Sequence, residues 1–189
     1  MQSKTKRYIA LFIILNVFVY LYFSFSKRPS ESAPLQKREA PDISEILQYG
    51  DKVENVKLTD KYGNVFDMDA YRDQPLLLLF MKSDFEHLQK YDTELRISLK
   101  DFFDKGLKPI YINSTFEIPK EQIENYKGAI KIFQDTDDFL FFNKFKSRKC
   151  CGSSILLDRK HIVLLSTISS LRPQQIKDIV EYKEDSIFN

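Results

Sequence analysis

The sequence has few residues of the kinds that bind metals or carry thiol chemistry. Its 189 residues include two cysteines, Cys150 and Cys151, and two histidines, His87 and His161. Structural metal sites need several such side chains at short spacings, whereas the two histidines lie far apart among scattered acidic residues. We therefore predict no metal site and no cofactor. Because no cysteine lies near Lys27, we also exclude the lipid anchor of a lipoprotein there.

Acidic residues are missing from the beginning of the chain. No Asp or Glu precedes Glu31, while five of the 29 basic residues lie before it. The rest of the chain carries 24 basic against 27 acidic groups, a net charge of −3. A nucleic-acid-binding surface needs a basic patch or stripe. We therefore expect no nucleic-acid partner.

Charged residues are also missing from residues 8–25, an apolar run long enough to cross a bilayer as a helix. A cleaved signal peptide is the alternative, but its apolar region is usually only about 7 to 15 residues long. We predict an uncleaved transmembrane anchor, so that the chain partners the membrane through residues 8–25. Residues 26–41 contain Pro, Ser and several charges without periodicity, which is typical of a linker.

The basic residues on the two sides of this run favour one orientation slightly. Lys4, Lys6 and Arg7 precede it, and residues 27–38 contain further basic groups. Because basic residues collect on the cytoplasmic side, we predict a cytoplasmic N-terminus over residues 1–7. A single-pass membrane protein results, with the domain of residues 42–189 in the periplasm or otherwise outside the cytoplasm.

The domain is organised around residues 76–95. Residues 76–80, LLLLF, are too few for a membrane span and contain no polar residue, which predicts a strand buried on both faces of a parallel sheet. Ser83 and Glu86 form a predicted capping box. Apolar residues then recur at helical spacing until Lys105 and Gly106 end the helix.

Strands and helices alternate along the rest of the domain. The patterns predict a hairpin with a turn at residues 62–64, strands at 107–112 and 130–133, a helix opened by Pro119, an aromatic helix at 137–145, a hairpin over 155–166 and a last helix opened by Pro173. The aromatic helix is expected to be core or lid, because a base-stacking platform would need the basic stripe that is absent. The order indicates an α/β fold.

These features resemble the thioredoxin-like redoxin family, in its branch of membrane-anchored thiol-disulfide oxidoreductases and peroxiredoxin relatives. The resemblance runs from Gly50 almost to the end of the chain. Phe80 and Leu95 match the flanks of the family's active-site segment, and further matches are Leu58, Asp60, Gly63, Tyr71 and the run Ser153 to Asp158. The resemblance implies a thioredoxin-like fold, with a central mixed sheet flanked by helices and preceded by one transmembrane helix.

Both cysteines of the family's Cys-x-x-Cys motif are missing. Phe85, Glu86, His87 and Leu88 stand in its place, although the family's chemistry needs a thiolate activated at the helix N-terminus and a second thiol that resolves the mixed disulfide. Gly152 also replaces the family's cis-proline, so a cis peptide bond is not expected there. We therefore predict a redoxin scaffold that has lost its usual reaction.

Two functions remain open. The first is a binding or structural module, whose surface at Phe85, Glu86, His87, Leu88 and Gly152 would hold a protein or peptide partner; alternatively, Phe85 and Leu88 turn inward and close the groove. The second is a thiol-disulfide oxidoreductase or peroxiredoxin-like enzyme. Its candidate catalytic residues are Cys150, Cys151 and His87, with His87 or Lys149 lowering a thiol pKa. The simpler interpretations are buried cysteines and a solvated histidine.

Overall fold

The structure of the protein is a computed structural model that describes residues 46–54, 56–114, 116–146 and 152–189. Residues 42–189 form one compact unit. The predicted N-terminus 1–7, membrane anchor 8–25 and linker 26–41, together with Cys150 and Cys151, lie outside the described residues. Within the described ranges, no helix has the length and apolar character needed to cross a membrane.

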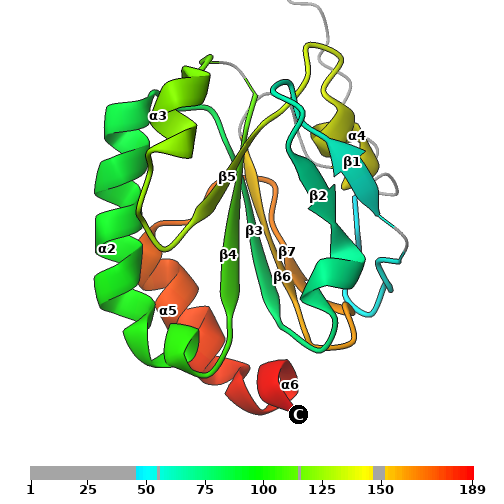
Figure 1. Ribbon diagram of the computed structural model, residues 1–189. Helices are drawn as coiled ribbons and strands as arrows, with labels where there is room; N and C mark the ends of the chain where they lie inside the picture. The colour runs from blue at the N-terminus through cyan, green and yellow to red at the C-terminus, as the bar shows by residue number, and fades with distance from the viewer. Residues whose placement is uncertain (1–45, 55, 115, 147–151) are drawn as a thin grey trace, which may run out of the picture. The chain divides into compact units, whose positions relative to one another are not determined.

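A five-stranded mixed sheet forms the centre of the unit (Figure 1), in the order β5-β4-β3-β6-β7. Strands β3, β4 and β5 are parallel, and β6 runs antiparallel to both β3 and β7. The carboxyl ends of β3, β4, β5 and β7 therefore lie at one edge, which we call the carboxyl edge. The strands are β3 (Leu76–Met81), β4 (Lys108–Asn113), β5 (Lys131–Gln134), β6 (Ser153–Leu157) and β7 (Val163–Ser166).

The central strand β3 is buried on both faces, as its apolar run predicts. Leu76, Leu78 and Phe80 belong to the core on one face, and Leu77 and Leu79 belong to the core on the other. Alternate side chains of a strand point to opposite faces, so a strand covered on both sides has to be apolar at every position.

Helices α2 (Phe85–Asp104) and α5 (Pro173–Tyr182) cover one face of the sheet (Figure 1). Their buried residues Leu88, Leu95, Ile176 and Val180 share one core with Leu77 and Leu79. The short helices α3 (Lys120–Glu124) and α6 (Glu184–Phe188) complete the helical elements of this side. Helix α6 follows α5, so α5 is not the last helix, contrary to the prediction. Pro119 is the N-cap of α3 and not its first residue.

The other face is covered by the hairpin of β1 (Lys57–Thr59) and β2 (Val65–Asp67), the 3-10 turn η2 (Met68–Tyr71) and α4 (Leu140–Lys144). The hairpin turns near Gly63, as predicted. Helix α4 is shorter than the predicted 137–145, because Phe139 has left-handed backbone angles and ends any helix that would precede it. Its aromatic residues are core: Phe141, Phe142 and Phe145 are buried with Phe66 and Phe80.

Candidate functional site

The turn from β3 into α2 lies at the carboxyl edge and ends with Asp84. The Asp84 carboxylate accepts a hydrogen bond from the backbone N–H of His87 at 2.9 Å, which makes Asp84 the N-cap of α2. The predicted capping box of Ser83 and Glu86 is therefore wrong by one residue. The Ser83 hydroxyl is instead hydrogen-bonded to the Tyr111 hydroxyl, so it does not serve the helix end.

His87 forms an exposed pair with Asp84. Its Nδ1 lies 2.7 Å from Asp84 Oδ1. The hydrogen bonds from the His87 backbone and side chain lower the pKa of the Asp84 carboxyl. In the part of the chain that the structure describes, no hydrogen bond joins His87 to a hydroxyl or thiol. His87 therefore has no nucleophile to activate there.

Phe85 and Leu88, which the resemblance aligns with the family's cysteines, are oriented differently. Leu88 is fully buried in the core between α2 and the sheet. Phe85 is half-buried at the edge of that core, and its ring meets the ring of Tyr126 in a T-shaped contact with centroids 5.7 Å apart. Leu88 thus offers no apolar surface to a partner, because its position in the first turn faces inward. Of the two alternatives, Leu88 follows the inward orientation and not the exposed patch. Glu86 and His87 remain exposed.

The buried Tyr111 on β4 supports the turn between β3 and α2. Besides the Ser83–Tyr111 contact, the backbone N–H of Ser83 donates to the Asn113 side chain at 3.3 Å. Burial raises the pKa of Tyr111 to about 12, so its hydroxyl stays protonated at neutral pH. Strand β4 thereby fixes the loop that precedes α2.

Gly152, which follows Cys151, packs against the end of β3. A Cβ atom at this position would lie 2.4 Å from the Phe80 carbonyl oxygen and 2.3 Å from Ser170 Oγ, and Gly152 has φ +73°. No cis peptide bond occurs within the described ranges. Gly152 brings the β6 strand close to the α2 turn, where a side chain would not fit.

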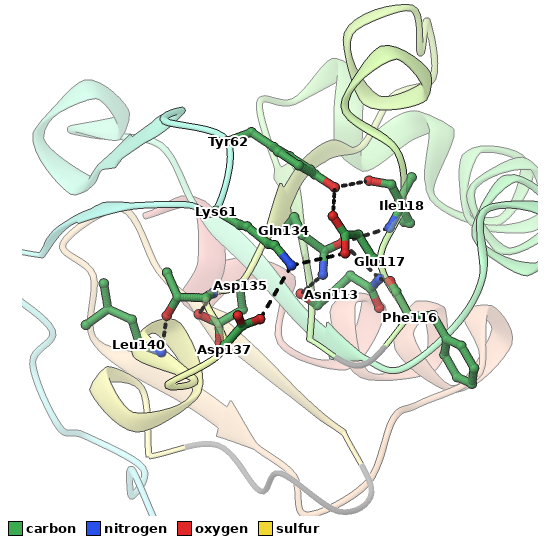
Figure 2. Close-up of polar contacts among 11 residues, drawn as sticks. Lys61, Tyr62, Asn113, Phe116, Glu117, Ile118, Gln134, Asp135, Asp137 and Leu140 are labelled. Atoms are coloured by element: carbon green, nitrogen blue, oxygen red, sulfur yellow. Dashed lines mark hydrogen bonds and ion pairs between the residues drawn. The ribbon is translucent and has the colours of Figure 1, made fainter.

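A polar network occupies the carboxyl edge beyond β4 and β5 (Figure 2). Gln134 joins Asn113 to the loop after β4, since its side chain accepts from Asn113 at 3.2 Å and from the Ile118 backbone at 3.2 Å. Lys61 binds Glu117 at 3.1 Å and Asp137 at 3.5 Å. The hairpin and two strand ends are therefore tied together by polar side chains.

Two buried aspartates fix the backbone around this network. Asp60 accepts hydrogen bonds from the backbone of Tyr62, Asn64 and Gln134. Asp135 accepts from the backbone of Phe141 at 2.9 Å, while burial raises the pKa of its carboxyl. The sequence indicated Asp60 only through the family resemblance, and nothing in the local pattern indicated Asp135.

The chemistry available at this edge is limited. In residues 46–54, 56–114, 116–146 and 152–189, no group of three or more His, Cys, Asp or Glu side chains is placed to hold a metal ion. The acidic side chains here accept hydrogen bonds from backbone N–H groups or form ion pairs with lysine. The arrangement is suited to holding loops in place.

The chain matches no family model and no curated protein, but it resembles many solved structures. A protein from Chlorobium tepidum assigned as the thiol:disulfide interchange protein DsbE has a TM-score of 0.56 at 18% identity, over 76% of this chain and 99% of that one. Peroxidoxin BcpB from Mycobacterium tuberculosis has a TM-score of 0.59 at 17% identity, over 75% of this chain and 98% of its own.

A third similar structure is the thioredoxin domain of a thiol-disulfide oxidoreductase from Bacteroides vulgatus, with a TM-score of 0.52 at 18% identity, over 72% of this chain and 97% of that one. At these identities the likeness concerns the fold. The strand order, the position of α2 and the hairpin of β6 and β7 all agree with it. The described part of the chain has the thioredoxin-like fold of the redoxin family.

Proposed function

We propose that this protein is a membrane-anchored thioredoxin-like domain outside the cytoplasm that has lost the dithiol reaction and binds a protein or peptide at its carboxyl edge. The observation that carries the proposal is the pair of residues at the start of α2. Leu88 is built into the core and Phe85 packs against Tyr126. Neither side chain can accept or release electrons as a thiol does. At the start of α2, where the family carries its dithiol, this chain therefore has packed apolar side chains.

Exposed apolar side chains around the same edge support a binding role. Phe116, Leu140 and Ile168 follow strands β4, β5 and β7 and are 54%, 40% and 50% exposed. Because these strands end at one edge of the sheet, their following residues lie on the same side of the domain. Burial of apolar area favours association between proteins. A partner that covers these residues would gain affinity from them.

A pair of matched substitutions tests this binding role. We would attach a photo-crosslinker to the full-length protein in its own cells at Phe116, and at Ile97 as the control. Ile97 is 78% exposed but lies in the middle of α2. The proposal predicts a defined crosslinked partner from position 116, lost in a Leu140→Asp background, and none from position 97. Equal crosslinking from both positions would contradict it.

The membrane anchor and its orientation need their own test. We infer the anchor from the apolar length of residues 8–25. We infer a cytoplasmic N-terminus from the basic residues before them. Alkaline carbonate extraction should leave the protein in the membrane pellet. Protease added to intact spheroplasts should digest the domain, and a protected domain would reverse the proposed orientation.

A thiol enzyme that uses Cys150 or Cys151 is the second candidate. The observation that favours it is the position of Gly152, the next residue in the chain, against the carbonyl of Phe80 at the end of β3. A working thiol must be partly ionised near neutral pH. Alkylation of the native full-length protein by iodoacetamide between pH 6 and 9 separates the candidates. Rapid labelling with an apparent pKa well below about 8.5 would support the enzyme, whereas slow labelling that completes on denaturation would support the binding module.

A further inference from the structure

A cavity of about 620 Å³ lies between α2 and the segment formed by α3 and the turn after it. One wall is a single stripe of α2 formed by Phe85, Gln89, Asp92, Thr93 and Arg96, which recur three or four positions apart and so share a face of the helix. The opposite wall comes from the end of α3 and the turn after it, including Asn125, Tyr126 and Gly128. Figure 1 shows α3 beside the first half of α2.

Asp92, which lines the cavity, has a buried carboxylate oxygen with no partner in the part of the chain that the structure describes. Asp92 is only 2% exposed. Its Oδ2 accepts hydrogen bonds from the Tyr126 hydroxyl and from the backbone N–H of Ala129, the latter at 3.2 Å. Its Oδ1 has no hydrogen-bond partner among the described residues. Buried polar atoms in folded proteins are nearly always paired, so this oxygen is an acceptor that a ligand's donor could satisfy.

Tyr126 covers the same carboxylate through its other oxygen, Oδ2. Its ring lies across Gly128, where a Cβ atom would overlap both the ring and Asp92 Oδ2. One hydroxyl hydrogen bond to Asp92 and one edge contact with Phe85 hold the ring in place. Because the ring is only partly buried, outward rotation about its side-chain bonds would open the carboxylate to the cavity.

The charges around the cavity are balanced and separated. Asp92 and Glu121 supply two negative charges, and Arg96 and Lys127 supply two positive ones. Arg96 is exposed, follows Asp92 by one helical turn, and forms no ion pair with an acidic side chain within the described ranges. Residues one turn apart have Cβ atoms about 5–6 Å apart, a spacing that lets them contact the two ends of one small molecule.

We propose that this cavity binds a small zwitterion of amino-acid or dipeptide size. Its ammonium group would donate to Asp92 Oδ1, and its carboxylate would bind the Arg96 guanidinium, which is suited to carboxylates. The partial burial of Phe85 and Tyr126 gives an apolar rim for the rest of the molecule. Phe85 lines this cavity and also lies at the start of α2, but the two polar anchors Asp92 and Arg96 are not among the residues proposed for the partner at the carboxyl edge.

Calorimetric titration of the full-length protein tests the proposal. The probes are the standard amino acids and the dipeptide Ala-Ala, with N-acetylated and carboxamide forms of each binder as controls. We expect saturable binding of at least one free zwitterion, weakened about tenfold or more when either end is blocked. Absence of saturable binding by every free zwitterion at millimolar concentration would overturn the proposal, as would equal binding of the N-acetylated form.

Three variants locate the binding. Asp92→Asn removes the charge with little change in shape, and Arg96→Gln changes an exposed residue that the fold does not need. Lys100→Gln is the matched control, since Lys100 is an exposed cation on the same helix outside the cavity. We expect both Asp92→Asn and Arg96→Gln to weaken binding about tenfold or more and Lys100→Gln to leave it unchanged. Because Arg96 is exposed, its substitution should leave the fold intact. Binding that is equally strong in Arg96→Gln would therefore place the ligand elsewhere and contradict the proposal.

Discussion

Gly152 lies so close to Phe80 that a Cβ atom at position 152 would be 2.4 Å from the Phe80 carbonyl oxygen. Real Cβ contacts do not occur at this distance, and backbone carbonyls in a central strand cannot move aside easily. Gly152, which the resemblance aligns with the family's proline, is therefore required by this structure. It joins β6 to the carboxyl end of β3, beside the start of α2.

Gly152→Ala should destabilise the fold more than a glycine substitution elsewhere. Gly63→Ala is the matched control, because Gly63 also has positive φ but a Cβ atom added there would meet no other atom within 4 Å. We expect Gly63→Ala to cost about 1–2 kcal/mol from backbone strain alone, and Gly152→Ala to cost clearly more. Urea unfolding of the two variants measures the difference; equal free energies of unfolding would show that position 152 has room.

The two residues in place of the cysteines should differ in their contribution to stability. Leu88 is fully buried, so Leu88→Ala should lower the free energy of unfolding by about 2–5 kcal/mol. Phe85 is half-buried at the rim, and Phe85→Ala should cost less because the site can collapse or fill with water. Chemical unfolding of both variants would check this order, and a larger loss for Phe85→Ala would contradict the assigned burial.

The Asp84 cap should make stability depend on pH in the acidic range. Hydrogen bonds from His87 lower the pKa of the folded carboxyl, so the unfolded chain takes up a proton first as the pH falls. The contribution is therefore present above the ordinary pKa of about 3.9 and is lost as the pH falls through the lowered value. Thermal melts of wild type and Asp84→Asn should converge at the acidic end, because Asn also caps helices but carries no charge. Melting temperatures that differ by the same amount at every pH would argue against a contribution from the charge of Asp84.

Tyr111 should titrate later than an ordinary tyrosine. Burial raises its pKa to about 12, so its stabilising contribution is complete below the unfolded value of about 10 and is lost as the pH rises from there toward 12. Tyrosinate absorbance reports this directly, because the chain contains no Trp. The difference titration between wild type and Tyr111→Phe should show one group that ionises near pH 12, and a group that ionises near pH 10 would contradict the burial.

Much of the fold was predictable because its signals are local. Leu76 to Phe80 form an unbroken apolar run, and Gly63 and Gly106 have the positive φ that turns and helix ends require. Strand β3, helix α2 and the first hairpin therefore matched the prediction. Helix α4 did not, because the left-handed Phe139 follows from packing of its ring against the core and not from local preference.

The site was less predictable because its contacts join distant parts of the chain. Asp60 reaches the backbone of Gln134, and Asp92 reaches Tyr126 and Ala129. The helical pattern places Asp92 on the apolar face of α2, where a charged residue is unusual. The pattern does not indicate which residues contact Asp92. The choice of Asp84 over Ser83 as N-cap likewise depends on Tyr111, which engages the Ser83 hydroxyl from β4.

Insulin reduction is the decisive assay for loss of the dithiol reaction. The full-length protein and its Cys150→Ser/Cys151→Ser variant would be compared in the presence of a dithiol reductant, with turbidity of reduced insulin as the readout. Phe85 and Leu88 supply no thiol at the start of α2, so we predict the same rate for both proteins, equal to that of the reductant alone. Turnover by the wild type well above that of the cysteine-free variant would show that the protein has kept a thiol reaction.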